Sequence, residues 1–393
     1  MIDRLAIIRN RRLAHWLYGL CVLVLTVTQP ASAEKTFEIE SDRDTVLTAE
    51  TIARFDEPWA IAFLPDDAML VTTQPGRLWL VDPDGDKIEV SGVPTVAYAG
   101  QGGLGDVIVD PNFTDNREIL LSYVASEDGG RTRGAVVVRA VLDRRRNTPV
   151  LRDITEIWRQ EPFVRGTGHY SHRLIIGPKN TNHAGYLFIA SGERQKQTPA
   201  QAMNTNLGKI VRLHADGRIP KDNPFAKRGG IARQFWTIGH RNILGLAFDA
   251  SGQLWAQEMG PRHGDELNRI ERGGNYGWPI VSEGRHYSGE SIPRHATHPE
   301  FRAPIVAWVP AISPAGLSIY NQDRFVGWQG DALLGGLSSR AMVRVDLDRD
   351  TPQEIERFEW GERVRAVQVG PDGALWVLED GDGRLLRLTQ QAA

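Results

Sequence analysis

The stretch "LGLAFDASGQLWAQ" (244–257) contains the pattern that is repeated along this chain. Apolar residues alternate with small or polar ones, a turn rich in Asp, Ser and Gly follows, and a second apolar run comes after it. Period-two alternation on both sides of such a turn predicts a β-hairpin.

Five further segments follow the same pattern: "WAIAFLPDDAMLVT" (59–72), "LGDVIVDPNFTDNREILLSY" (104–123), "HRLIIGPKNTNHAGYLFIAS" (172–191), "AGLSIYNQDRFVGWQGDALLGG" (315–336) and "RAVQVGPDGALWVLED" (365–380). Their spacing of roughly 45 to 70 residues leaves room for two more strands in most intervals. A β-sandwich is the alternative, but it does not predict a repeat in regular phase. We expect an all-β fold, a six-bladed β-propeller with four-stranded antiparallel blades, as a single domain over residues 34–393.

The composition fits this expectation. Of 393 residues, 41% are hydrophobic and 24% are charged, which is typical of a globular protein with a sizeable core. The 40 glycines and 22 prolines favour many turns, and the 11 tryptophans pack well in β-structure.

The N-terminus has the pattern of an export signal. Arg9, Arg11 and Arg12 precede an apolar run over residues 13–27, and "ASA" (31–33) forms a small-x-small cleavage site. The apolar run is shorter than the roughly 20 residues that span a bilayer. We therefore expect residues 1–33 to be a signal peptide cleaved after Ala33, which leaves a periplasmic or secreted protein with no stable membrane span. An uncleaved anchor is the alternative.

Cleavage would remove Cys21, the only cysteine, so the mature chain could form no disulfide or thiolate metal site. The formal net charge of the whole chain is −3, and no basic block or tail indicates nucleic-acid binding. A monomer and a homodimer are both compatible with the sequence.

Polar or aromatic residues stand immediately before the first strand of each predicted hairpin: Glu57, Gln101, His169, Arg241 with Asn242, Trp308 and Arg363. Equivalent positions of propeller blades lie on the same end of the disc, so we expect these residues to converge on one pocket near the central channel. His169 is the candidate general base, since the unperturbed pKa of histidine lies near neutral pH. A hydrogen-bonded histidine at a strand end is the alternative.

Three arginines favour an anionic ligand. Arg241, Arg363 and Arg365 carry guanidinium groups suited to bidentate pairing with carboxylates or phosphates. The alternative is that these arginines pair with nearby acids of the chain itself.

The segment "EMGPRHGDELNRIERGGNYGWP" (258–279) is rich in Gly, Pro and oxygen-bearing side chains, including Asp265, Glu266 and Asn268. Such loops supply ligands to a hard cation, so Ca²⁺ fits better than Zn²⁺, although an ordinary capped turn is the alternative. The two His-x-x-His pairs, 169–172 and 295–298, have no obvious third zinc ligand.

Five longer motifs follow one another along the chain: "GQGGLGDVIVDPNF" (100–113), "LGKIVRLHADGRIPKDNPF" (207–225), "IGHRNILGLAFD" (238–249), "GPRHGDELN" (260–268) and "GGNYGWP" (273–279). In this order the chain resembles the soluble aldose sugar dehydrogenases of the glucose/sorbosone dehydrogenase family, which depend on pyrroloquinoline quinone (PQQ). The resemblance covers nearly all of the mature chain. It implies a six-bladed propeller that carries PQQ and Ca²⁺ on its top face.

The resemblance also implies roles for individual residues. His169 corresponds to the catalytic base of the family. The implied PQQ contacts are Gln101, Arg241, Asn242, Tyr287, Arg363 and Arg365. Gly260 and Pro261 correspond to the residues whose carbonyls hold the cofactor-bound calcium, and Glu266 and Tyr276 to a second calcium site. Trp308 corresponds more loosely to an aromatic residue that lines the sugar pocket.

The implied reaction is the oxidation of an aldose at C1 to a lactone, with hydride transfer to PQQ and transfer of electrons to an external acceptor. His169 would take the proton of the C1 hydroxyl. A calcium-dependent propeller lactonase and an inactive sugar-binding propeller are the alternatives.

The chain departs from the family pattern at three places. Gly168 stands where an Asn or Asp is common, and Ser339 lies in a segment, "GLSSRAM" (336–342), that lacks a frequent lysine; Arg340 is the residue that could compensate. A small residue is usual at the position of His172, so we expect His172 to crowd or extend the sugar pocket. These departures bear on the substrate and on the affinity for PQQ.

Overall fold

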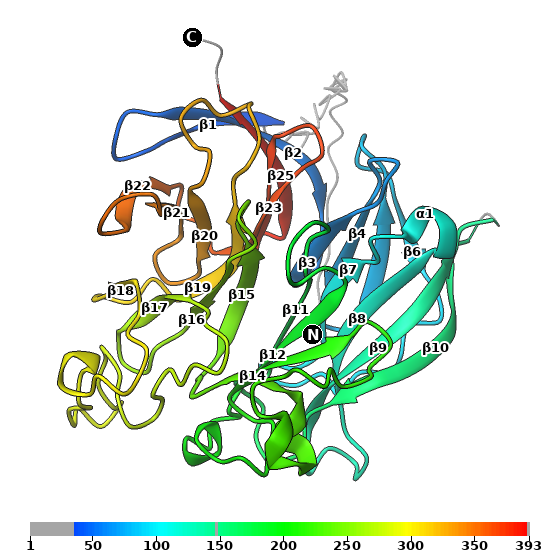
Figure 1. Cartoon of the computed structure of the whole chain (residues 1–393). Coiled ribbons are helices and arrows are strands. Elements are labelled where there is room, and N and C mark those ends of the chain that lie inside the picture. The colour runs from blue at the N-terminus through cyan, green and yellow to red at the C-terminus, as the bar shows by residue number, and fades with distance from the viewer. Residues whose placement is uncertain (1–34, 146–147, 391–393) are drawn as a thin grey trace, which may run out of the picture. The chain divides into compact units, whose positions relative to one another are not determined.

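The computed structural model describes residues 35–145 and 148–390, and the predicted signal peptide lies outside these residues. Within the described ranges, the strands form six antiparallel sheets arranged around a central axis (Figure 1). The described residues contain no helix long and apolar enough to cross a membrane. The expected six-bladed β-propeller is confirmed, and the sandwich alternative is wrong.

The sheets, called blades one to six, are built as follows. Blade one contains β3 (Pro58–Phe63), β4 (Met69–Thr73), β5 (Arg77–Val81) and β6 (Lys87–Val90). Blade two contains β7 (Leu104–Val109), β8 (Glu118–Ala125), β9 (Gly134–Asp143) and β10 (Val150–Arg159). Blade three contains β11 (Ser171–Ile176), β12 (Tyr186–Ser191), β13 (Lys209–His214) and β14 (Phe235–Ile238).

Blade four contains β15 (Ile243–Phe248), β16 (Leu254–Glu258), β17 (Asp265–Arg269) and β18 (Val306–Trp308). Blade five contains β19 (Pro314–Ile319), β20 (Ala332–Gly336), β21 (Ala341–Asp346) and β22 (Gln353–Glu359). Blade six contains β23 (Val364–Val369), β24 (Leu375–Glu379), β25 (Arg384–Gln390), β2 (Val46–Arg54) and β1 (Thr36–Glu40). The helical elements of the described ranges are short: α1 (Phe113–Asn116), η1 (Thr198–Ala200), η2 (Ala226–Arg228), η3 (Gly230–Gln234) and η4 (His295–Thr297).

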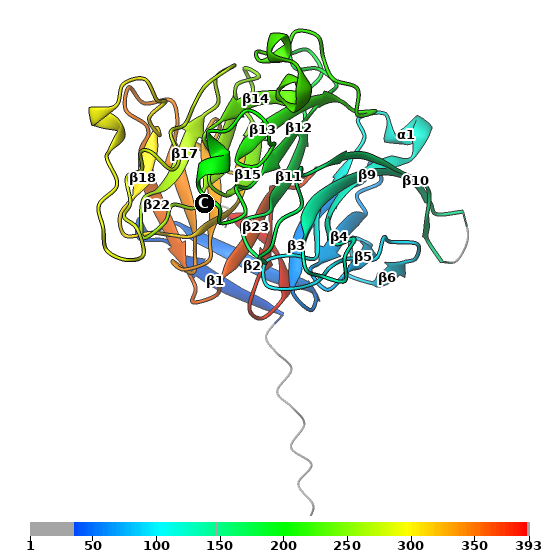
Figure 2. The same ribbon diagram turned by 90° about the horizontal axis from the view of Figure 1, so that it is seen from below.

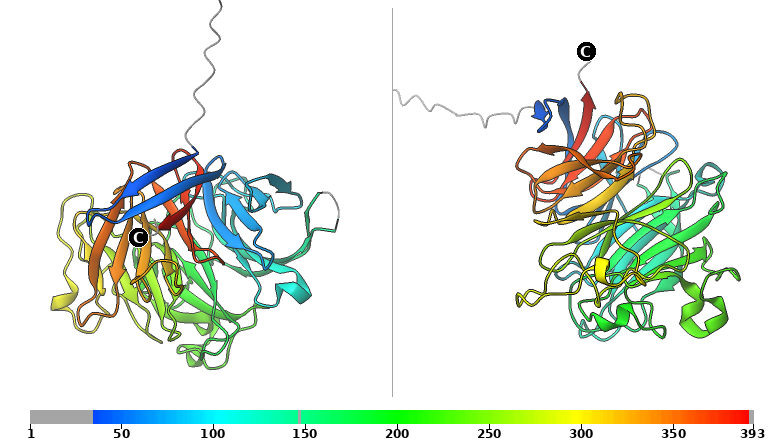
Figure 3. Two further views of the ribbon diagram at one scale, coloured as in Figure 1. Left: turned by 90° about the horizontal axis from the view of Figure 1, so that it is seen from above. Right: turned by 60° about the vertical axis from the view of Figure 1, so that its left-hand side comes forward.

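Blade six closes the ring with strands from both ends of the described chain. Strand β2 pairs antiparallel with β25, and β1 adds a fifth strand outside it. Figures 2 and 3 show the two N-terminal strands, in blue, beside the C-terminal strands, in red. Because this pairing joins residues more than 300 positions apart, for example Arg54 and Arg384, it holds the first and last blades together.

The first strands of the blades surround the axis. Strands β3, β7, β11, β15, β19 and β23 contact one another in a closed order. Each of them carries a register shift against its neighbour close to its start, for example between Ser171 and Leu174 and between Val364 and Ala366. A bulge bends a strand and redirects side chains, and bulges are frequent at barrel rims and active sites. The same rim of every blade is therefore shaped to direct side chains toward the axis.

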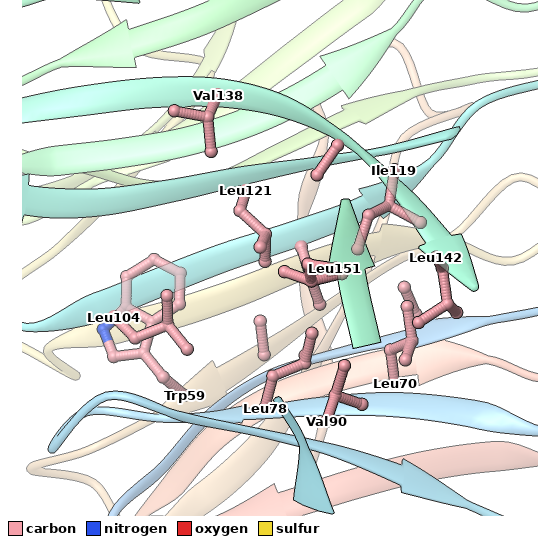
Figure 4. Packing of buried hydrophobic residues seen from close by; sticks show 14 of the residues in the cluster. Trp59, Leu70, Leu78, Val90, Leu104, Ile119, Leu121, Val138, Leu142 and Leu151 are labelled. Atoms are coloured by element: carbon pink, nitrogen blue, oxygen red, sulfur yellow. The ribbon is translucent and has the colours of Figure 1, made fainter. Parts of the chain in front are cut away.

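The hydrophobic core lies between adjacent blades. In the interface of blades one and two, Leu70 and Leu78 of blade one pack with Leu121 and Val138 of blade two, all of them buried (Figure 4). Burial of one such side chain contributes about 1.5–3 kcal/mol, so these contacts hold the blades in fixed relative positions. The rigid ring can then position polar residues that lie far apart in sequence.

Candidate functional site

The site lies at the open ends of the hairpins that the first and second strands of each blade form, opposite to their turns. In an antiparallel hairpin, residues before the first strand lie beside residues at the end of the second. The predicted ring residues Gln101, His169, Asn242 and Arg363 stand before β7, β11, β15 and β23, as expected. The structure adds an acidic partner at the end of the second strand in three blades.

In blade three this partner is Glu193. The Nδ1 atom of His169 lies 2.5 Å from Oε1 of Glu193, and the backbone N–H of His169 donates to Oε1 of Gln101 at 2.7 Å. A carboxylate only accepts hydrogen bonds, so it selects the tautomer with the proton on Nδ1. With the proton on Nδ1 and directed at Glu193, Nε2 is the ring nitrogen whose lone pair can accept a proton.

Burial controls the charge of this pair. His169 is only 6% exposed, and burial lowers its pKa, although the bond to Glu193 acts in the opposite direction. For Glu193, burial by itself raises the pKa, but hydrogen bonds from His169 and from the backbone of Gln197 lower it below its usual value overall. The arrangement is a neutral imidazole oriented by an ionised carboxylate, which is the form required of a general base at neutral pH.

In blade six the acidic partner is Asp380. Arg363 donates from Nε to Oδ2 of Asp380 at 2.8 Å, and Arg365 donates from Nε and Nη2 to Oδ1 at 2.8 and 2.5 Å. The structure therefore shows the alternative that the sequence left open, in which Arg363 and Arg365 pair with an acid of the chain itself. Two guanidinium groups share one carboxylate, so one positive charge is left over for an anionic ligand.

In blade four the acidic partner is Glu258, and it holds the backbone of Arg241. Oε2 of Glu258 accepts the N–H of Arg241 at 2.7 Å, while Oε1 lies 2.8 Å from Nδ1 of the buried His240. The guanidinium of Arg241 donates to the carbonyl of Met259 at 3.0 Å and to the hydroxyl of Tyr287 at 3.3 Å. Its Nε is buried and has no partner among the described residues, so the site retains a donor for a ligand.

Residues from these blades line a common cavity of about 240 Å³. Five of the predicted site residues are in its lining: Gln101, His172, Asn242, Arg363 and Arg365. Met259 lines this cavity and a narrow neighbouring one that contains Arg241. His169 is not in the lining and lies at its edge, bonded to Gln101. Tyr287 stands at the outside and is 72% exposed.

Trp308 does not belong to the ring that we expected. It lies in β18, the outermost strand of blade four, where its side chain is buried between blades four and five with Leu267 and Val343. Its indole N–H donates to Oε2 of Glu354 on β22 at 2.6 Å. The position before β19 that lines the cavity is Ser313. The prediction from the repeat phase is wrong for Trp308, because this residue belongs to the outermost strand of blade four and a further segment leads from it to the start of β19.

A candidate cation site adjoins the cavity. Gly260, Pro261, Glu266 and Tyr276 line the narrow cavity of about 10 Å³, together with Glu258. That volume is about that of one water molecule or ion. The amide of Asn268 donates to both carboxylates, at 3.3 and 3.2 Å.

Two observations bear on how a cation would be held. Burial and the adjacent Glu258 raise the pKa of Glu266 well above its usual value, and a bound cation would remove this penalty. The hydroxyl of Tyr276 already donates to the carbonyl of Arg269, so its backbone carbonyl, which lies 3.2 Å from Nε2 of His295, is the group left to coordinate a cation through its second lone pair. The described residues contain no cluster of three or more His, Cys, Asp or Glu suited to a metal, so backbone carbonyls would have to complete the set.

The structure shows the surroundings of Gly168, Ser339 and Arg340, where the chain departs from the family pattern. A Cβ added at Gly168 would lie 2.8 Å from the side-chain amide of Gln195, so an amide already stands near that position. Arg340 is exposed and donates to the carbonyl of Gly361 at 3.0 Å. Ser339 lies outside the lining of the cavity.

Glu193, Glu258 and Asp380 were not predicted from the sequence, although a signal was present. All three stand at or just after the end of the second strand of a repeated hairpin. Hairpin geometry places that end beside the ring residues that were identified at the start of the first strand.

Known proteins are similar to this chain in sequence and in architecture. The model of the Glucose / Sorbosone dehydrogenase family matches residues 55–387. Aldose sugar dehydrogenase YliI of Escherichia coli is 38% identical over 345 residues, which cover 86% of this chain and 91% of that protein.

Two solved structures are similar. The apo form of the soluble aldose sugar dehydrogenase of Escherichia coli has a TM-score of 0.81 at 36% identity and covers 88% of this chain and 100% of that one. The PQQ-bound form of an aldose sugar dehydrogenase from Streptomyces coelicolor has a TM-score of 0.70 at 27% identity, covering 87% and 98%. The chain belongs to the Glucose / Sorbosone dehydrogenase family.

Proposed function

We propose that this protein oxidises an aldose at C1 to the lactone, with PQQ and Ca²⁺ as cofactors and an external electron acceptor. The observation that carries the proposal is the His169–Glu193 pair at the edge of a cavity lined by two arginines. A base and an anion-binding surface are both required to oxidise a sugar on a cofactor that bears several carboxylates.

The residues fit the cofactor. Arg363 and Arg365 have one positive charge in excess of Asp380, and Arg241 keeps a buried Nε without a partner in the described chain. Gln101 and Asn242 add amides to the same lining. When bound, PQQ supplies the acceptor for the hydride released from C1, with Ca²⁺ as a Lewis acid.

The chain's own contribution is a positioned proton acceptor. Nε2 of His169 takes the proton of the C1 hydroxyl as the C–H bond breaks. Glu193 keeps the proton on Nδ1 and stabilises the imidazolium that forms, and the bond from the His169 backbone to Gln101 fixes the start of the strand. Gly260 and Pro261 would hold the cofactor-bound calcium through their carbonyls, and Glu266 and Tyr276, which line the same narrow cavity with Glu258, would serve a second calcium.

The proposal places the protein outside the cytoplasm. The basic region, apolar run and "ASA" motif of residues 1–33 support export with cleavage after Ala33. N-terminal sequencing of the protein recovered from the periplasmic fraction tests this directly. A cytoplasmic protein that retains Met1 would contradict it.

The test of the activity is reconstitution. Purified apoprotein is incubated with PQQ and Ca²⁺ and assayed against a panel of aldoses with an artificial electron acceptor. Activity is expected only with both cofactors, and chelation of calcium should remove it. The matched control is lactone hydrolysis without PQQ, because a propeller lactonase would need the cation but not the quinone. Lactone hydrolysis together with no aldose oxidation would replace the proposed activity.

A further inference from the structure

His172 occupies the inner end of the cavity that contains the arginines. Its side chain is 2% exposed and lines the cavity with Trp59 and Tyr170. The imidazole lies 4.9 Å from the Trp59 ring, at an interplanar angle of 36°, and meets Tyr170 edge-on at 6.3 Å. These contacts form an aromatic surface at the bottom of a cavity whose other groups are mainly polar.

The orientation of the imidazole is fixed by Ser122. The hydroxyl of Ser122 donates to the carbonyl of His172 at 2.8 Å and accepts the backbone N–H of Asp106 at 2.7 Å. Its oxygen also lies 3.0 Å from Nδ1 of His172. Because the single hydroxyl proton goes to the carbonyl, Nδ1 is the donor in the third contact. Burial lowers the pKa of His172 to about 3, so the ring is neutral and adds no charge beside the arginines.

This aromatic surface separates two cavities. A second cavity of about 630 Å³ lies along the first strands of the blades and is lined by Arg173, Asp106 and Gly245. Arg173 and Gly245 directly follow His172 and Leu244 in the sequence. His172 and Leu244 line only the 240 Å³ cavity, so the boundary between the two cavities lies at these positions. The guanidinium of Arg173 packs 3.8 Å from the Trp59 ring centroid and pairs with Asp106 at 3.3 Å. Trp59 therefore contacts both His172 and Arg173.

The backbone accommodates His172 at a cost. Its φ is +50°, in the left-handed region that favours glycine, so a histidine here is retained against backbone strain. Space for its ring is provided by Gly105, since the three atoms nearest to a Cβ built there all belong to the imidazole and would overlap with it. Strain that persists at a cavity is a reason to look for a function.

We propose that His172 and Trp59 form the floor of the cofactor cavity. The planar ring system of the cofactor rests on this floor, which separates the cofactor cavity from the 630 Å³ cavity along the first strands. The inference rests on the proposed function and changes the expected role of His172 from the sugar pocket to the cofactor. A sugar would reach His169 at the cavity edge, whereas His172 lines the cavity itself and is 2% exposed.

The test measures PQQ binding in the presence of saturating Ca²⁺. Protein fluorescence at equilibrium gives Kd, and transfer of bound PQQ to an excess of another apoprotein gives the rate of release. His172→Gly suits the local φ, so it should fold, and it is expected to raise Kd about tenfold through faster release. Gly105→Ala should push the ring aside and weaken binding in the same direction. In G105A/H172G the methyl group enters vacated space, so the loss should not exceed that of H172G. His298→Gly, a histidine exchange on the surface, is the matched control with unchanged Kd.

The outcomes separate the two proposals. A wild-type protein that does not bind PQQ would overturn the proposed function and the floor with it. If the wild type binds PQQ and the Kd of H172G lies within about twofold of the wild-type Kd, the proposed floor is wrong while the proposed function stands. A double-variant loss equal to the product of the single losses would also overturn the floor, because it would show that Gly105 and His172 act independently. Thermal unfolding of each apoprotein verifies that all variants are folded.

Discussion

Blades three and six place a carboxylate at the same open end of the hairpin formed by their first two strands, but the chemistry at the two positions differs. In blade three, Glu193 faces one imidazole and orients it through Nδ1. In blade six, Asp380 faces two guanidinium groups, Arg363 and Arg365, and neutralises only part of their charge. Both carboxyl groups have a pKa below their usual value, although burial alone would raise it. The backbone of the repeat provides the position, and the residue before the first strand decides what the acid does.

The comparison predicts that changes in blade three act on the chemical step and changes in blade six on the anion site and on stability. The difference follows from what each acid holds. A base must exchange a proton in each turnover, whereas a paired guanidinium keeps its charge throughout.

The largest effect is expected for His169→Gln. The amide keeps a polar group near Glu193 but cannot accept a proton, so kcat should fall by at least about 100-fold. The affinity for PQQ should change little, since His169 is outside the cavity lining. Steady-state kinetics of the reconstituted enzyme, with PQQ titration by fluorescence, give both values. Retention of more than a tenth of kcat would assign the base to another group.

Glu193→Gln should have the next largest effect, a fall in kcat of about 10- to 100-fold with a displaced pH profile. The bond to Glu193 and its charge raise the pKa of His169 against the effect of burial. The amide oxygen of glutamine can still accept from Nδ1, but loss of the charge lowers that pKa further. Activity is lost when the imidazole becomes protonated, so the acidic limb of kcat should move to lower pH. A reduced kcat with an unmoved limb would show that Glu193 supports only the local structure. Glu193→Asp, which keeps the charge, is the control and should retain the position of the limb.

Asp380→Asn should act mainly on stability. Removal of the charge leaves two neighbouring guanidinium groups uncompensated, at a cost of about 1–3 kcal/mol in the free energy of unfolding. Since the folded-state pKa of Asp380 is depressed, its stabilisation is present above the unfolded-state pKa and is lost as the pH falls through the folded one. The difference in stability between wild type and variant should therefore be constant near neutral pH and shrink below about pH 4. Denaturant unfolding of the apoproteins over this range measures it, and a difference independent of pH would contradict the ion-pair explanation.

The sequence was sufficient for the fold because each blade repeats one local pattern. Alternation around a turn predicts a hairpin from neighbouring residues alone, and six hairpins in phase leave few architectures. The closing pair of β2 and β25 was not foreseen, because its register depends on contacts such as Leu47 with Gln390 across the whole described chain.

The site was only partly predictable. His169, Arg241 and Arg363 stand at equivalent positions, so repeat phase locates them, but phase does not say which acid each one meets. The partners are set by strand pairing and by the bulge at the start of each first strand. For His172, the sequence identified an unusual residue, whereas its packing on Trp59 and its bond to Ser122 depend on three different blade strands.

The smallest effect is expected for Trp308→Phe, which contrasts a core position with the open ends of the hairpins. Phe keeps most of the packing between blades four and five but loses the 2.6 Å hydrogen bond to Glu354. Glu354 retains Arg357, which donates to both of its oxygens, so the carboxylate is not left unpaired. Stability should fall by about 1 kcal/mol, as for a typical hydrogen bond, while KM for the sugar stays within about twofold. Unfolding and steady-state kinetics give the two values, and an unchanged stability with a tenfold higher KM would return Trp308 to the substrate pocket.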